Sequence, residues 1–300
     1  MQKGDKSVFF QQLVNGLTLG SSYAVIAIGY TLIFGVLNII NMAHGEIFML
    51  GAFIGLLLVT KFQFGIFTAL LGAMVGGAIL GYLLERTALR PLRQKKVSHL
   101  APLISTIGVA IFLESAALNL FGPQTRAFPS EFSGHLLDFS FFKISMIQVI
   151  SLGTAVFLML VLQLIIEKTK VGKSIRATAE NVETAGLLGI NTNKVIVWTV
   201  MLASALGAAA GVLVALSFDA IEPTMGVMMG FKGLAVLILG GLGNIKGAMA
   251  GGFILGVAEV FSVAYGASSY RDAVGFGMII ILLFWRPQGL FSKAGEGGRP

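Results

Sequence analysis

The stretch VIVWTVMLASALGAAAGVLVALSF, residues 195–218, runs for 24 residues without a charged side chain. A helix of this length spans the roughly 30 Å hydrocarbon core of a bilayer. Two further uncharged runs, 62–84 and 144–166, are long enough to do the same. A soluble core would need polar positions at regular intervals, which these runs lack. They predict an all-α fold, that of a polytopic helical integral membrane protein.

The composition of the chain agrees with this class. Hydrophobic residues make up 56% of it and charged residues 12%, and the mean hydropathy is +0.88. Glycine occurs 39 times in 300 residues, and small residues let membrane helices approach one another closely. Cysteine is absent, which excludes disulfides and thiolate metal sites. We expect one transmembrane domain over residues 1–300.

Positive charge gathers in three short segments beside apolar runs. They contain Arg86, Arg90, Arg93, Lys95 and Lys96; Lys168, Lys170, Lys173, Arg176 and Lys194; and Arg286, Lys293 and Arg299. The net charge is +7, but no extended basic stripe with interleaved aromatics exists, so we expect no nucleic-acid partner. The positive-inside rule places all three segments in the cytoplasm.

Two other loops, 122–143 and 218–223, are acidic or balanced in charge and contain Pro and Gly turn signals. They belong on the outer side of the membrane. This alternation predicts three single crossings, at about 97–121, 144–166 and 195–217.

The N-terminal part of the chain has three apolar stretches, 11–37, 42–60 and 64–84. A cytoplasmic N-terminus requires an even number of crossings, so one stretch would then be broken or re-entrant. The best place for a break is NIINMAHGE, 38–46, because a His and a Glu are costly in lipid unless they face protein or water. An extracellular N-terminus with three full spans is the competing topology.

The C-terminal part has three apolar stretches as well, 226–243, 247–268 and 272–285. Three crossings, or one crossing and a re-entrant pair, both bring the C-terminus inside. The whole chain then has about eight transmembrane helices plus broken or re-entrant segments.

The two ends of the chain also echo each other. The sequence AVIAIG at 24–29 is similar to AVLILG at 235–240, and a Gly-rich polar break and an apolar helix follow each of them. Gly-interrupted apolar segments in corresponding halves are typical of transporters with internal repeats. The alternative is a chance echo in a Gly-rich membrane protein.

Three segments carry a family resemblance: GLTLGSSYAVIAIGYTLIFGVLNIINMAHGEIFMLGAF (16–53), RATAENVETAGLLGINTNKV (176–195) and AVLILGGLGNIKGAMAGGFILGVAE (235–259). They resemble the LivH-type permease subunits of bacterial branched-chain amino acid ABC importers. The resemblance implies a multi-pass protein of the bacterial inner membrane that carries an amino acid substrate. It also implies two cytoplasmic ABC ATPases, a second homologous permease and a periplasmic substrate-binding protein as partners.

The resemblance suggests a coupling role for the cytoplasmic loop 167–194. Within it, 173–189 reads as one short helix, with Ile175, Ala179, Val182 and Gly186 in a narrow stripe. Gly189 can end this helix in a left-handed conformation, and Thr192 or Asn193 can cap the next one. By resemblance we assign ATPase coupling to Arg176, Ala179, Glu180, Ala185, Gly186 and Gly189. A solvated helix lying on the membrane is the alternative.

Candidate residues of the substrate path lie near the predicted break. His44 can meet an amino acid's carboxylate and Glu46 its ammonium, while Asn38 and Asn41 can offer hydrogen bonds. Alternatively, all four satisfy backbone groups freed by the break. Glu114 and Glu259 lie in apolar stretches, where they either line the path or pair between helices. We expect Lys232 and Lys246 to extend toward the lipid headgroups.

We expect no catalytic residue, metal site or cofactor. The chain has no G-x-x-x-x-G-K-[ST] loop, so energy must come from another chain. An ion-coupled secondary carrier, which transports when expressed alone, is the rival outside the family. A urea or short-chain amide permease is the rival within it.

Overall fold

The computed structural model describes residues 3–95, 98, 100–129, 136–139, 142–266 and 270–291. Its helices are α1 (Lys3–Leu37), α2 (His44–Thr60), α3 (Ile66–Leu84), the π-helix η1 (Glu85–Leu89), α4 (Arg90–Gln94), α5 (Leu100–Phe121), α6 (Met146–Lys168), α7 (Lys170–Glu180), α8 (Val182–Leu187), α9 (Thr192–Phe218), α10 (Met225–Gly240), α11 (Ile245–Ala264) and α12 (Arg271–Trp285). Its strands are β1 (Arg126–Ala127), β2 (Leu136–Phe139), β3 (Phe142–Ser145) and β4 (Ala220–Ile221).

The prediction of a polytopic helical membrane protein is confirmed. Within the described residues, six helices are long and apolar enough to cross a membrane, namely α1, α3 with its extension to Gln94, α5, α6, α9 and α11. Two shorter apolar helices, α2 and α10, join them. Among the described residues, the strands form two small antiparallel pairs, β1 with β4 and β2 with β3.

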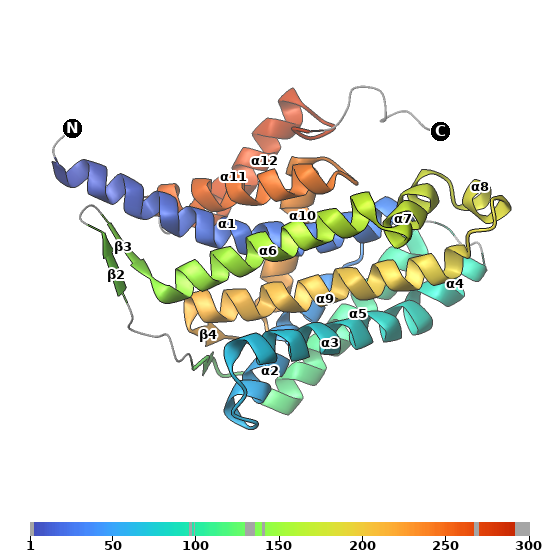
Figure 1. Ribbon diagram of the computed structural model, residues 1–300, viewed down its shortest axis with the longest axis horizontal. Helices are drawn as coiled ribbons and strands as arrows, with labels where there is room; N and C mark the ends of the chain where they lie inside the picture. Colours follow the sequence, from blue (N-terminus) through green and yellow to red (C-terminus); the bar gives the residue numbers. More distant parts are fainter. Residues whose placement is uncertain are drawn as a thin grey trace.

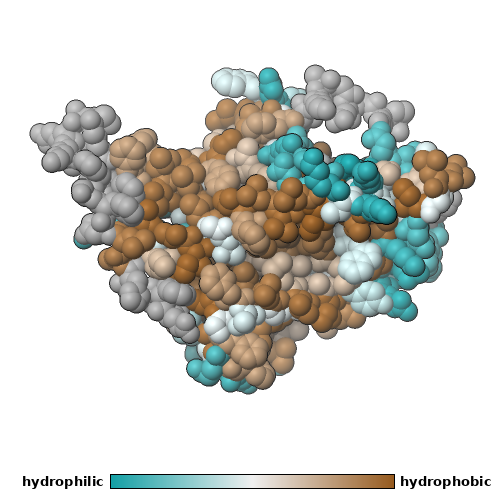
Figure 2. Space-filling model, in the orientation of Figure 1, coloured by the Kyte–Doolittle hydropathy of each residue, from teal (hydrophilic) through white to brown (hydrophobic). Residues whose placement is uncertain are grey.

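The long helices run side by side, and the loops gather at two opposite ends (Figure 1). Arg93 Nη2 donates to Asn193 Oδ1 at 3.1 Å, which joins the end of α4 to the start of α9. The basic segments around α4 and α7 therefore share one end, the end that the positive-inside rule assigns to the cytoplasm. Figure 2 shows hydrophilic residues over this end and hydrophobic residues along α6 and α9.

The N-terminus lies at the outer end. The backbone N–H of Lys143, in the outer loop, donates to Gln11 Oε1 at 3.0 Å, and Figure 1 shows the start of α1 beside β2 and β3. The N-terminus thus lies opposite the basic segments, so cytoplasmic basic segments agree with the competing extracellular N-terminus and not with a cytoplasmic one. The sequence left this open because the first residues carry too little charge to set a side.

The predicted break at 38–46 is present, because residues 38–43 are not helical and α2 begins at His44. The helix lies against the middle of α9: a Cβ on Gly207 would lie 3.0 Å from the His44 ring. The chain thus ends α1 at the cytoplasmic end and returns to mid-depth. From there it continues as α2.

An internal repeat relates α1–α2–α3 to α9–α10–α11. Helix α1 contacts α11, and its counterpart α9 contacts α3. Helix α1 also contacts α10, and α9 contacts α2. The corresponding helices α2 and α10 contact each other. Helices α1 and α9 run in opposite directions (Figure 1), so the repeat is inverted. The sequence echo was wrong about which helices correspond. It paired 24–29 in α1 with 235–240 in α10, whereas α1 corresponds to α9.

Helices α1 and α9 form the centre of the molecule. Every residue of α9 from Ala203 to Leu216 is buried. Small side chains make this possible, since Gly51 and Gly77 both lie directly against Ala208. By contrast, α3, α5 and α6 expose rows of large apolar side chains such as Leu71, Ile104 and Leu160, which suits lipid or a partner subunit.

Candidate functional site

Two asparagines shape the break between α1 and α2. Asn38 has a positive φ of 52°, and its N–H donates to the Phe34 carbonyl at 2.8 Å, so it ends α1 in a left-handed conformation. Asn41 is buried, and its Oδ1 accepts from the Ala43 N–H at 3.2 Å. Asn38 is exposed. The Asn41 side chain thus satisfies a backbone group of the break, whereas Asn38 contributes through its own backbone conformation.

His44 lies at the start of α2 and is fully buried. Its ring meets that of Tyr30 edge to face, with 4.6 Å between the centroids. A Cβ on Gly29 would lie 2.4 Å from Nε2, so glycine at that position leaves the space that the imidazole fills. His44 is thus packed between α1 and α9.

Glu46 follows in the first turn of α2 and is 2% exposed. Its carboxylate lies against Gly226 of α10, where a Cβ would come within 2.4 Å of Oε2. Among the described residues, no donor lies within hydrogen-bond distance of Oε2. An ionised side chain at this depth costs about 2.5 to 3.5 kcal/mol in lipid, so Glu46 requires protein or water in front of it.

The N-terminal ends of α2 and α10 meet at this point. A Cβ on Gly45 would lie 2.3 Å from the Gly226 carbonyl oxygen and 2.9 Å from Gly230 Cα, so the two backbones touch. The first N–H groups of a helix lack intrahelical partners and carry partial positive charge. Two such ends facing each other inside the membrane create a polar point that can attract an anionic group.

A second polar cluster lies nearer the outer end of the molecule. Glu259 Oε2 accepts from Tyr23 Oη at 2.9 Å, from Lys232 Nζ at 2.9 Å and from Arg271 Nε at 3.0 Å. Lys232 Nζ also lies 2.8 Å from Asp272 Oδ1. We call these five residues the ionic cluster. It ties α1, α10, α11 and α12 together with two positive and two negative charges.

The ionic cluster changes the interpretation of two residues. Lys232 does not extend to the headgroups, because it is 3% exposed and doubly paired. Glu259 lies away from the break and pairs between helices. This was the alternative expected for it if it does not line the path. Lys246 is exposed and pairs with Glu167 at 3.1 Å. The pairing of Lys232 could have been inferred, since an intramembrane lysine needs an intramembrane carboxylate.

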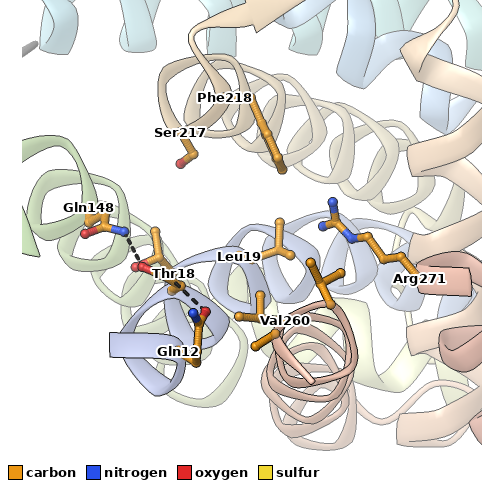
Figure 3. A pocket seen from close by; sticks show the side chains of 11 residues that line it. Gln12, Thr18, Leu19, Gln148, Ser217, Phe218, Val260 and Arg271 are labelled. Atoms are coloured by element: carbon orange, nitrogen blue, oxygen red, sulfur yellow. Dashed lines mark hydrogen bonds between the residues drawn. The ribbon is translucent and has the colours of Figure 1, made fainter. Parts of the chain in front are cut away.

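A cleft of about 350 Å³ adjoins the ionic cluster. Figure 3 shows the Arg271 guanidinium reaching into it beside Phe218 and Leu19, 5.9 Å from the centre of the Phe218 ring. On the other side, Gln148 Nε2 donates to Asn15 Oδ1 at 2.8 Å. These amides are paired with one another, and Arg271 is the one charged residue among the described residues that line the cleft.

The cytoplasmic segment is two helices and not the single helix that was expected over 173–189. Asn181 interrupts it with extended backbone (φ −161°, ψ 115°), and its side chain accepts from the Thr184 N–H and caps α8. An asparagine side chain competes with the helical backbone in this way. The stripe of four residues is therefore split between α7 and α8. Asn191, and not Thr192 or Asn193, caps α9.

Helix α7 is held firmly against the end of α6. Thr169 Oγ1 accepts from the Gly172 N–H at 3.0 Å, and Arg176 donates to the Ile166 carbonyl. A Cβ on Gly172 would lie 2.2 Å from the Ile165 carbonyl oxygen, so only glycine permits this approach. Arg176 thus sets the angle between α6 and α7.

The remaining residues assigned to coupling differ in exposure. Ala179, Glu180, Gly186 and Gly189 are exposed, whereas Ala185 is buried. Gly189 has a φ of +84°, the left-handed conformation expected for it. The tip of the segment exposes Leu187 (89%) and Leu188 (76%), and water alone does not favour two adjacent leucines there.

In the part of the chain that the structure describes, no group of three His, Cys, Asp or Glu side chains could hold a metal ion. The same part of the structure brings together small residues, a broken helix pair and, among the described residues, the Glu46 Oε2 atom without a hydrogen-bond partner. Such an arrangement can pass a polar solute between packed helices.

Comparison with known proteins agrees with this geometry. The model of a family described as "Branched-chain amino acid transport system / permease component" matches residues 12–283. The chain belongs to this family. It is a multi-pass membrane permease component, and the family is one of transport proteins and not of enzymes.

Relatives of this permease match along nearly the whole chain. BraD of Pseudomonas aeruginosa, a high-affinity branched-chain amino acid transport system permease protein, is 37% identical over 95% of this chain and 96% of its own length. LivH of Escherichia coli, which carries the same description, is 40% identical with the same coverage. PsaBC of Streptococcus pneumoniae in complex with Fab aligns with a TM-score of 0.45 and 13% identity over 96% of this chain and 93% of its own, a likeness too weak to bear on the fold.

Proposed function

We propose that this chain is the transmembrane permease subunit of an ATP-binding-cassette importer for branched-chain amino acids in the bacterial inner membrane. The observation that carries the proposal is identity of 37–40% along 95% of the chain to permeases named for that transport. The inner membrane follows from the bacterial source of those relatives. Residues 1–300 act as one permease domain, with 122–143 as its periplasmic loop.

The arrangement of the helices supports transport by alternating access. Inverted repeats allow two related conformations in which one repeat rocks against the other around a fixed point. Here that point is the contact of α2 with α10, where His44 and Glu46 lie. Asn38 and Asn41 shape the chain at the same break, and Glu259 links α1 of the first repeat to α10 and α11 of the second through the ionic cluster.

The partners follow from the same proposal. Two cytoplasmic ABC ATPases supply energy, a second homologous permease completes the path, and a periplasmic binding protein delivers the substrate. The exposed apolar faces of α3, α5 and α6 leave room for a second permease, and the exposed tip of α8 offers a docking point for an ATPase.

In this arrangement the two cytoplasmic helices have separate roles. Helix α7, fixed to α6 by Arg176, transmits movement to the membrane. Helix α8 inserts Leu187 and Leu188 into the ATPase, while Ala179, Glu180, Gly186 and Gly189 lie on the exposed side of the segment. Ala185 packs α8 onto the rest of the segment.

Transport by the assembled complex tests the function. The chain is reconstituted in liposomes with two ATPases, a second permease and the binding protein encoded beside it. We expect ATP-dependent leucine uptake, and none from the chain alone. Uptake by the chain alone under an ion gradient would establish the secondary carrier instead. ATP-dependent uptake of urea without leucine would establish the rival within the family.

The variant Gly186→Trp tests the coupling role. A Cβ on Gly186 meets nothing within 4 Å, so the change leaves this chain's own packing intact. Overpacking a fitted interface costs about 1 to 3 kcal/mol, enough to displace a small docking helix. We expect normal assembly in the membrane, loss of leucine uptake and loss of stimulation of the ATPase by the binding protein. Gly277→Trp in α12, where a Cβ also meets nothing within 4 Å, is the control, and normal coupling in Gly186→Trp would contradict the assignment.

A further inference from the structure

A pocket of about 150 Å³ opens on the surface between α5 and α10. Its floor is the contact of α2 with α10, and Glu46 forms part of its wall. Glu114, from α5, lines the same pocket. The pocket therefore brings two carboxylates, 68 residues apart in the chain, to one point inside the membrane-spanning region.

The charge of this pocket is one-sided. No lysine or arginine lines it within the described residues, and Glu46 Oε2 is buried without a hydrogen-bond partner. A buried carboxylate oxygen without a donor is costly, so the pocket favours a ligand that donates hydrogen bonds and carries positive charge. The hydroxyl-bearing Tyr30 also belongs to the lining.

The remaining wall is apolar. Ile107 and Ile111 of α5 face Val227 and Phe231 of α10 across the mouth. These four side chains are 39% to 59% exposed in the isolated chain, so a small branched hydrocarbon group can be covered there without displacing the core. Gly226, in the first turn of α10, adds the positive end of a helix beside the carboxylates.

We propose that this pocket is a substrate-binding station of the transport path, in which Glu46 and Glu114 bind the ammonium group of an aliphatic amino acid. The side chain of the substrate lies on the apolar wall, and its carboxylate faces the first turn of α10. The proposal rests on the proposed function and deepens it. It also implies that the α5–α10 face borders the aqueous path, because two carboxylates facing lipid would cost much free energy.

Protection of an introduced cysteine tests binding directly, because the chain has no cysteine of its own. In the assembled complex, Val227→Cys is labelled with a small maleimide in the presence of millimolar ligand. We expect leucine and 3-methylbutylamine, which keep the ammonium group, to slow labelling. We expect 4-methylpentanoate, which lacks that group, to have no effect. Adding Glu46→Gln and Glu114→Gln should abolish the protection.

Uptake measurements show how much transport depends on the two carboxylates. Charge-assisted hydrogen bonds of this kind correspond to about a tenfold or larger effect when they are lost, so we expect Glu46→Gln/Glu114→Gln to lower the leucine uptake rate at least that much. The control is Glu222→Gln, an exposed carboxylate of the outer loop that accepts from Thr125 Oγ1 at 3.1 Å, which should transport normally. Co-purification with the other subunits shows whether each variant assembles.

The outcomes separate this proposal from the proposed function. If the native complex takes up leucine while the double variant is equally active and Val227→Cys is never protected, the pocket proposal is wrong and the function stands. If the native complex takes up no amino acid, the function itself is wrong. If the double variant fails to assemble, protection of Val227→Cys with both carboxylates present still decides, and equal protection by all three ligands would overturn ammonium recognition.

Discussion

The ionic cluster and the break at α2 both place charge inside the membrane, but they satisfy it differently. In the ionic cluster, Glu259 Oε2 accepts three hydrogen bonds and Lys232 pairs with two carboxylates. At the break, Glu46 Oε2 has no partner among the described residues. Both glutamates are almost completely buried, at 1% and 2% exposure.

This difference separates a structural role from a functional one. A fully paired cluster holds its helices in one arrangement, and a ligand gains nothing by entering it. An unpaired carboxylate beside a pocket has bonds left to make, so a solute can be held there and released. The depth and burial of a charged residue do not by themselves reveal which role it plays; its partners do.

The largest expected effect is on stability, from Glu259→Ala. The change leaves Lys232 and Arg271 without their common partner, and breaking a buried ion pair costs about 3 to 5 kcal/mol. We expect a much lower midpoint of thermal unfolding in detergent, followed by circular dichroism. The charge-balanced variant Lys232→Met/Glu259→Leu, which leaves Arg271 and Asp272 to neutralise each other, should recover most of the loss. An unchanged midpoint in Glu259→Ala would mean that the ionic cluster has no structural role.

A smaller loss is expected from Gly45→Ala at the crossing of α2 and α10. The added methyl group would come within 2.3 Å of the Gly226 carbonyl oxygen, and overpacking of this kind costs about 1 to 3 kcal/mol. Both thermal stability and leucine uptake should fall. Gly108→Ala in α5, where a Cβ meets nothing within 4 Å, is the matched control. Equal behaviour of the two variants would mean that the two helices do not cross closely.

A modest gain in stability is expected from Glu46→Gln. The change removes a charge whose oxygen lacks a partner, and an unsatisfied buried group costs about 1 to 3 kcal/mol. We expect unfolding at slightly higher temperature together with slower uptake, a trade of stability against activity. The same measurement on Glu259→Gln should show destabilisation. A clear loss of stability in Glu46→Gln would place Glu46 with the structural residues.

The smallest expected effect is on the accessibility of two single positions, which a labelling experiment measures. Cysteine is introduced at position 46 or 259 and tested with a membrane-impermeant maleimide in each nucleotide state of the complex. We expect Glu46→Cys to react in at least one state, because the path opens to it, and Glu259→Cys to stay protected. Complete protection of position 46 in every state would favour a buried structural role for it.

The sequence by itself determined the features that depend on neighbouring residues. Uncharged runs of more than twenty residues predicted membrane helices, and the polar group in 38–46 predicted the interruption that the structure has at 38–43. Clusters of basic residues predicted that the segments around α4 and α7 share one end, and Gly189 predicted the left-handed end of α8. Length, hydropathy and backbone preference are local properties, so a single sequence displays them.

Only the tertiary structure decided which distant residues meet. Tyr23 and Glu259 bind each other although 236 positions separate them, and Lys232 finds its partners on α11 and α12. The side chain of Asn181 split a segment that helical spacing predicted to be continuous, and the side of the N-terminus depended on a contact with the outer loop. These outcomes follow from how the helices pack, because a charge inside the membrane takes whichever partner the fold brings within reach.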